Sequence, residues 1–284
     1  MTLRFRFHSV PNKTKKWLVP LTPTLMLSTT LLLSGCVTSP KLPPPPTTRA
    51  AAHADFATYP NKAGRIIQKG ENEVASYWTN SNFHIGKAHF YAVFFQVDRN
   101  ATNHPHVQAA HINVVTYRYN TRLHAWKLDS ILNNIARVGS FGMAPSVKVL
   151  KPIATTKDSA TFGFDDGSTN QGETDIWKDI LIYFKNAKGA RRAGFFYLGG
   201  IRISGDNKGS GLPPYYSYKG KLSVGKRLTA GGFPRLRVSY TGTATTLSYT
   251  GITSARSTVT CIASAGKRKR TYRYKCSPAP FVFG

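Results

Sequence analysis

Alternation of apolar and polar positions dominates this chain from about residue 83 onward. Ala160, Phe162 and Phe164 alternate with Thr161 and Gly163, which is the period of a half-buried strand. Further runs rich in aromatic and β-branched residues cover residues 83–98, 110–119, 179–185 and 194–204. Turn signals such as Asp166-Gly167 separate the runs. The pattern predicts a mainly β fold, an antiparallel sandwich or barrel-like meander.

Two segments break this period and favour helix instead. Leu128, Ile131, Leu132, Ile135 and Val138 follow the spacing of one helical face, so we expect one short helix near residues 129–138. Asp129 can cap this helix and Gly139 can end it. Apolar residues between 66 and 78 also approach helical spacing, although Gly70 interrupts them, and they indicate a second short helix.

The C-terminal third alternates apolar with basic residues. Leu236, Val238 and Tyr240 alternate with Arg235 and Arg237, which predicts a strand with one apolar and one basic face. Farther on, Cys261 and Cys276 are equidistant from a predicted hairpin tip at Arg268-Lys269. Two cysteines placed opposite each other can form a cross-strand disulfide. Closing such a loop contributes about 3 kcal/mol in the chain-entropy model.

The predicted hairpin tip is strongly basic. Residues 207–284 contain 14 Lys or Arg and no Asp or Glu. Guanidinium groups bind phosphate or carboxylate bidentately, and interleaved tyrosines can stack on rings. The candidate anion-binding residues are Lys267, Arg268, Lys269, Arg270 and Arg273. The alternative is a solvated turn whose charges prevent edge-to-edge strand pairing.

Composition and charge narrow the class of protein. With 41% hydrophobic residues the chain is too apolar to be disordered throughout. Its 39 Lys and Arg against 12 Asp and Glu give a formal net charge of +27. Five of the basic residues lie in residues 1–35, where no acid occurs, so the remainder carries +22. A surplus of this size favours anionic partners, although net charge by itself does not identify a ligand.

Near the N-terminus, residues 31–36 read Leu-Leu-Leu-Ser-Gly-Cys after a basic, polar start. Leu33-Ser34-Gly35-Cys36 resembles the lipobox of bacterial lipoprotein precursors. The resemblance implies cleavage before Cys36 and a diacylglyceryl group on its sulfur, hence anchorage to a membrane. Val37 in place of Asp implies an outer membrane location facing the periplasm, if the source is Gram-negative. The alternative is an uncleaved transmembrane anchor, but the apolar centre at residues 25–33 is shorter than the ~20 residues of a spanning helix.

This resemblance divides the chain into parts. Residues 1–35 are expected to be the signal peptide, and residues 36–60, with four consecutive prolines, a lipidated tether. Residues 61–284 are expected to form a β-rich periplasmic domain, and the basic composition leaves open a separate subdomain over residues 213–284. Lipidation of Cys36 would also leave Cys261 and Cys276 as an even pair in an oxidising compartment.

Candidate chemistry is sparse. His104 and His106 could face one side of a strand and bind zinc or copper, with His111 nearby, but Pro105 and the lack of neighbouring carboxylates argue against a metal site. The one acidic cluster lacks the spacing of a calcium loop, and its members are expected to cap turns and to pair with Arg191 and Arg192. Its residues are Asp165, Asp166, Glu173, Asp175 and Asp179.

No nucleophile, zinc-protease, nucleotide-binding or redox motif occurs. The sequence therefore predicts a non-enzymatic envelope lipoprotein without a cofactor, with a binding or structural role toward an anionic polymer or acidic protein surface. The alternative is a periplasmic hydrolase or metal-dependent enzyme using His104, His106 or the acids near Asp165. Anchorage outside the cytoplasm argues against nucleic acid as the partner.

Overall fold

The computed structural model describes most of the chain after residue 41. It covers residues 42–67, 73–99, 107–186, 193–211, 213, 215–229, 231–245, 252–254, 257–265 and 272–277. These residues belong to a unit that spans Leu42–Gly284. Several predicted features lie outside the described residues, namely the expected signal peptide (residues 1–35), Cys36, His104, His106, Arg191, Arg192 and the four basic residues 267–270.

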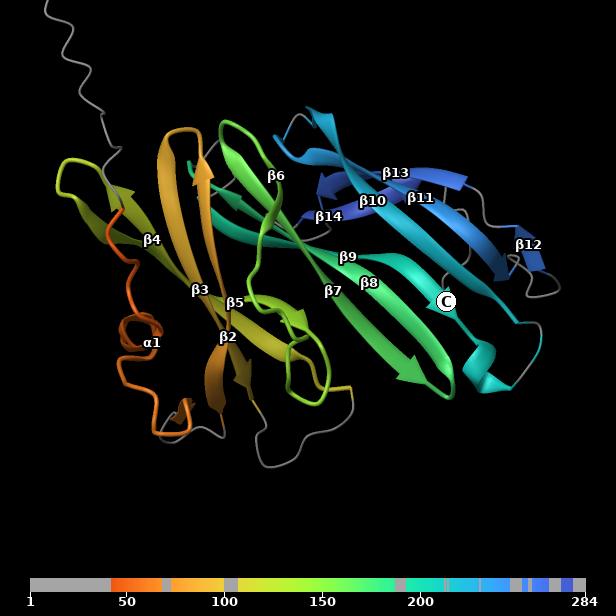
Figure 1. Cartoon of the computed structure of the whole chain (residues 1–284), viewed down its shortest axis with the longest axis horizontal. Helices are drawn as coiled ribbons and strands as arrows, with labels where there is room; N and C mark the ends of the chain where they lie inside the picture. Colours follow the sequence, from red (N-terminus) through yellow and green to blue (C-terminus); the bar gives the residue numbers. More distant parts are fainter. Residues whose placement is uncertain are drawn as a thin grey trace, which may run out of the picture. The chain divides into compact units, whose positions relative to one another are not determined.

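The described chain folds into two antiparallel sheets (Figure 1). The first sheet is a five-stranded meander of β1 (Arg65–Ile67), β2 (Val74–Ile85), β3 (Ala88–Asp98), β4 (Ala110–Asn120) and β5 (Ala125–Val138). The second sheet contains β6 (Pro152–Thr155), β7 (Ser159–Asn170), β8 (Glu173–Phe184), β9 (Gly194–Asp206), β10 (Ser217–Leu228), β11 (Pro234–Thr245), β12 (Ile252–Ser254), β13 (Ser257–Ala265) and β14 (Tyr272–Ser277). The predicted mainly β, antiparallel architecture is confirmed.

The sheets enclose one core between them. From the first sheet, Phe90, Phe94 and Val114 point toward the second sheet, where they meet Phe162 and Tyr183. Most of the aromatic rings here meet edge to face or tilted, an arrangement that aromatic pairs favour. Burying such side chains supplies most of the stabilisation of a sandwich.

A second core lies on the far face of the first sheet, where α1 (Thr48–Phe56) packs. Ala51 and Ala52 are fully buried there, and their small side chains let the helix approach β3 and β4 closely. Thr47 caps the helix, because its hydroxyl oxygen accepts a hydrogen bond from the Ala50 amide at 3.2 Å. The Trp126 indole donates to the Pro43 carbonyl at 3.1 Å. Folded structure thus begins within the expected tether, well before Asn61.

The third core is enclosed by the second sheet alone, which curls so that β14 lies against β9. Leu236, Val238 and Tyr240 point into this core, as their alternation predicts. Cys261 and Cys276 are directly opposite each other on β13 and β14 and form a disulfide. The predicted cross-strand pair is confirmed. Strands β10 to β14 continue the same sheet as β6 to β9.

The predicted helix near residues 129–138 is wrong, because this segment is strand β5. Its register against β4 shifts twice, so that residues 133–135 oppose Asn113 and Asp129 is an extra residue between Leu128 and Ser130. Such bulges insert residues into a strand and change the spacing of its inward side chains. The apparent helical face combines two sets of residues: Leu132, Ile135 and Val138 pack against the core between the sheets, whereas Leu128 and Ile131 are exposed.

Two smaller predictions are also corrected. Residues 66–78 contain strand β1 and the start of β2, so no helix forms there among the described residues. Asp166-Gly167 lies within β7, opposite Trp177 and Ile176, and the turn falls at Gln171-Gly172, both of which have positive φ. No helix in the described part of the chain is long and apolar enough to cross a membrane.

Candidate anion-binding surface on the second sheet

The outward face of β10, β11, β13 and β14 carries a group of exposed cations. These strands turn apolar side chains into the third core, so alternate residues face outward. We name the outward cations the basic sheet face: Lys219, Lys221, Arg235, Arg237 and Lys275, all of them exposed. The alternation of Arg235 and Arg237 with buried Leu236 confirms the predicted apolar and basic faces of this segment.

The cations on this face are staggered. Lys219 pairs with Thr241 across β10 and β11, and Lys221 pairs with Ser239. Arg237 lies between Ser223 on one side and Thr260 on the other. Like charges directly opposite each other destabilise a sheet, and the hydroxyl-bearing residues opposite Lys219, Lys221 and Arg237 avoid this cost. Lys275 is opposite Ile262 instead.

The same arrangement suits an extended anionic ligand. Cations two residues apart on one strand are separated by about 6.7 Å, and neighbouring strands by about 4.8 Å. Guanidinium and ammonium groups can bind phosphate, sulfate or carboxylate, and the intervening hydroxyls can donate further hydrogen bonds. The face can therefore contact several charged groups of one polymer at once.

Of the five candidate anion-binding residues predicted on the basic hairpin, Arg273 is the one that lies among the described residues. It follows Tyr272 on β14 and is exposed, whereas Tyr274 beside it points inward and donates a hydrogen bond to the Pro234 carbonyl at 2.7 Å. Arg273 also lies near Tyr197: burial and neighbouring carboxylates raise the pKa of that hydroxyl, and Arg273 partly offsets the rise. Lys219 and Lys221 were missed at the sequence level, although they alternate with Tyr218 and Leu222 just as the arginines of β11 alternate with their neighbours.

The structure brings two acids of the predicted cluster together, Asp166 and Asp179, and engages two others in separate ion pairs. Asp165 forms an ion pair with Lys178 at 2.5 Å, and Asp175 forms one with Arg202. Asp166 accepts a hydrogen bond from the Gly139 amide at 2.7 Å. The predicted pairing with Arg191 and Arg192 lies outside the described residues.

Among the described residues, Asp179 is the one deeply buried acid, at 3% exposure. Burial raises the pKa of its carboxyl to about 7; a hydrogen bond from Tyr197 lowers it, and the nearby Asp166 raises it further. The Tyr197 hydroxyl donates to Asp179 at 2.8 Å. A carboxyl in such surroundings readily stays protonated, and here it joins β8 to β9.

Histidine gives no metal cluster in the described part of the chain. Nδ1 of His111 lies 2.6 Å from the Asn134 side-chain oxygen, and burial lowers the pKa of its imidazole. Among the described residues, no group of three His, Cys, Asp or Glu side chains could hold a metal ion. The chain matches no protein-family model, no curated protein and no solved structure.

Proposed function

We propose that this protein is a lipid-anchored protein of the bacterial envelope that binds an anionic polymer through its basic sheet face. The lipobox ending in Cys36 supports the anchor, and the net charge of +27 supports an anionic partner. The binding role is non-enzymatic. It requires only that a rigid surface present its charges in a fixed pattern.

One observation carries the proposal: staggered cations with hydroxyl-bearing residues opposite them on a strand face in a region without acids. Lys221 opposite Ser239 and Arg237 opposite Ser223 repeat one motif on adjacent strands. A surface that serves only solubility does not need cations paired with hydroxyl-bearing residues in this way, because surface charges of mixed sign suffice for solubility. The inward faces of these strands fill a core, which holds the cations in place.

Binding is expected to be electrostatic and to depend on salt. Each polymer charge that a cation neutralises releases a counterion, so affinity falls linearly with salt on a double logarithmic scale. Three to five contacts therefore predict a slope several times that of a single ion pair. Removing cations from the face is expected to lower both the affinity and this slope.

The test uses full-length protein purified in detergent and heparin as the anionic polymer. The variant Lys221→Gln/Arg237→Gln/Lys275→Gln removes three charges from the basic sheet face. The matched control, Lys62→Gln/Arg137→Gln/Lys148→Gln, removes three exposed charges elsewhere. We expect at least a tenfold loss of affinity for the first variant at 0.15 M salt and less than a twofold loss for the control. Equal losses would show that net charge alone attracts heparin and would overturn the proposal.

The anchor is tested separately. Cys36→Ser is expected to abolish incorporation of labelled palmitate and to move the protein out of the membrane fraction of cells that express it. Cys276→Ser, which keeps the lipobox, serves as the control and is expected to retain the label. Palmitate incorporation by the Cys36→Ser protein would refute the anchor and leave the polymer-binding surface to be judged by its own experiment.

A further inference from the structure

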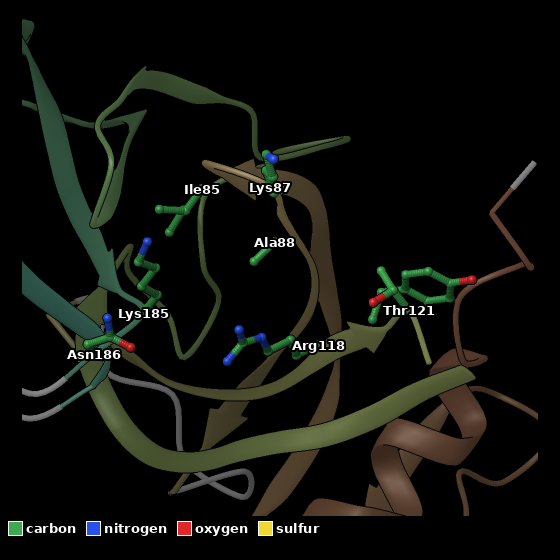
Figure 2. A pocket seen from close by; sticks show the side chains of 8 residues that line it. Ile85, Lys87, Ala88, Arg118, Thr121, Lys185 and Asn186 are labelled. Atoms are coloured by element: carbon green, nitrogen blue, oxygen red, sulfur yellow. The ribbon is translucent and has the colours of Figure 1, made fainter. Parts of the chain in front are cut away.

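A second cationic site lies at one end of the core between the sheets, apart from the basic sheet face. It is a pocket of about 370 Å³. Its lining comes from the β2–β3 hairpin, the end of β4 and the segment after β8, namely Ile85, Lys87, Ala88, Arg118, Tyr119, Thr121, Lys185 and Asn186. Figure 2 shows the Arg118 side chain directed toward Lys185 and Asn186 across the pocket.

Two of the cations extend rows of buried residues. On β4, Val114 and Thr116 are fully buried on the face toward the second sheet, and Arg118 is the next residue of that row. On β8, Tyr183 faces the first sheet, and Lys185 follows two residues later. The pocket therefore forms where the apolar filling between the sheets ends and two cations from opposite sheets replace it.

The Arg118 guanidinium is positioned without a carboxylate partner among the described residues. It lies over the Phe90 ring, 5.7 Å from the ring centroid. A cation on an aromatic face leaves the N–H groups at the edge of the guanidinium plane available to an oxyanion.

The charge around the pocket is unbalanced. The lining contains three cations and no carboxylate. Lys127 is directly opposite Arg118 in the β4–β5 register, so two like charges face each other across neighbouring strands. Such a pair is destabilising unless an anion lies nearby.

Two acids lie beside the pocket and only partly compensate. Asp158 Oδ1 is 3.6 Å from Lys185 Nζ, and this carboxylate is about half exposed. Asp129 accepts a hydrogen bond from the Tyr183 hydroxyl at 2.6 Å. Four cations against these two carboxylates leave a positive surplus at the pocket.

We propose that this pocket binds a compact organic anion whose phosphate or carboxylate group is held by Arg118 and Lys185. The adjoining Ile85 and Ala88 provide an apolar wall for the rest of the ligand, and the pocket volume suits a small molecule. A long polymer would lie along the basic sheet face, whereas this site accepts one terminal oxyanion group. The inference does not depend on the proposed polymer binding.

The experiment titrates the full-length protein in detergent with n-butyl phosphate, butyrate and inorganic phosphate by calorimetry. We expect saturable binding of butyl phosphate or butyrate, and at least fivefold weaker binding of inorganic phosphate, which lacks the apolar part. Arg118→Gln is expected to weaken binding at least tenfold and Arg118→Lys by less, because lysine keeps the charge but loses the bidentate fork. Arg137→Gln, on the same sheet but outside the pocket, is expected to bind as the parent protein does.

Circular dichroism establishes that each variant is folded. Undiminished binding by folded Arg118→Gln, or no saturable binding of any of the three probes, would overturn the site. Equal affinity for inorganic phosphate and butyl phosphate would refute the claim that Ile85 and Ala88 contact the apolar part of the ligand. Heparin binding is expected to persist in Arg118→Gln, so that failure at this pocket and failure at the basic sheet face give different results.

Discussion

The side-chain oxygen of Asn113 accepts a hydrogen bond from the backbone amide of Asn134 at 2.9 Å. Asn113 is 93% buried on β4, and Asn134 is the residue of the β5 bulge with a φ of +55°. The other end of the same side chain donates to Asp55 on α1 at 3.2 Å. One amide group thus fixes both the bulge and the helix against the first sheet.

Replacing Asn113 with Ala is expected to destabilise the protein by about 1–3 kcal/mol, because the Asn134 amide and the Asp55 carboxyl both lose a buried partner. Urea denaturation followed by fluorescence measures the change. Asn133→Ala, at an exposed position of the β5 bulge opposite Asn113, should cost less than about 0.5 kcal/mol. Equal costs at the two positions would show that the amide of Asn113 has no special role.

Loss of the disulfide is expected to lower the free energy of unfolding by about 3 kcal/mol. Cys261 and Cys276 are 15 residues apart in the sequence, and the bond between them restricts the unfolded chain by closing this loop. The Cys261→Ala/Cys276→Ala protein should denature at lower urea concentration than the parent. Addition of reductant should destabilise the parent and leave the double variant unchanged. A parent protein indifferent to reductant would contradict this expectation.

Stability is expected to fall as pH rises, through the titration of Asp179. Its folded-state pKa of about 7 exceeds the ordinary value of 3.8 because of burial. The folded state therefore holds this proton more tightly than the unfolded chain. The resulting stabilisation is complete below about pH 4 and is lost as pH rises through about 7.

Asp179→Asn, which keeps an uncharged side chain at every pH, isolates this effect. Between pH 4 and pH 8 the parent should lose stability that the variant keeps, so the variant should gain stability relative to the parent. The gain is at most about 4 kcal/mol, because the pKa of Asp179 is raised by about three units. Urea midpoints at pH 4, 6 and 8 measure the difference. Asp165→Asn, at a 60% exposed carboxylate, serves as the control and should show no such trend. A constant difference between Asp179→Asn and the parent would refute the assignment.

Removing Arg202 is expected to leave a partly buried charge without a partner. Its Nε donates to Asp175 at 2.8 Å, and the two side chains are only 14% and 20% exposed. Arg202→Met should cost about 3 kcal/mol, whereas adding Asp175→Leu should recover most of that loss, since an apolar pair replaces the ion pair. Thermal denaturation of the four proteins in this cycle provides the measurement, and a double variant no more stable than Arg202→Met would contradict it.

Local alternation predicted the β architecture and the direction of many side chains. The inward position of Val238 and the outward position of Arg237 follow from the two-residue period, and the cross-strand cysteines follow from their symmetry about one tip. These features depend on neighbouring residues alone. The predicted helix near residues 129–138 was wrong because the segment pairs with β4, and its bulge at residues 133–135 is held by Asn113, a residue of that other strand.

Contacts between elements that are far apart in the chain could not be predicted from the sequence. Ala51 and Ala52 follow four prolines and looked like part of a tether, and only the complementary surface of the first sheet makes their segment a buried helix. Arg118 and Lys185 lie at the ends of strands in different sheets, and nothing in their local sequence distinguishes them from other surface cations. Their proximity follows from the stacking of the sheets.

Strand β8 is buried on both of its faces. Leu181 and Tyr183 point into the core between the sheets, while Ile180, Ile182 and Phe184 point into the core that the second sheet encloses. A chain cut before β10 would expose this second row to water. The backbone amides of β8 should therefore exchange with deuterium only when both cores open together, and they are expected to report the global unfolding of the described fold.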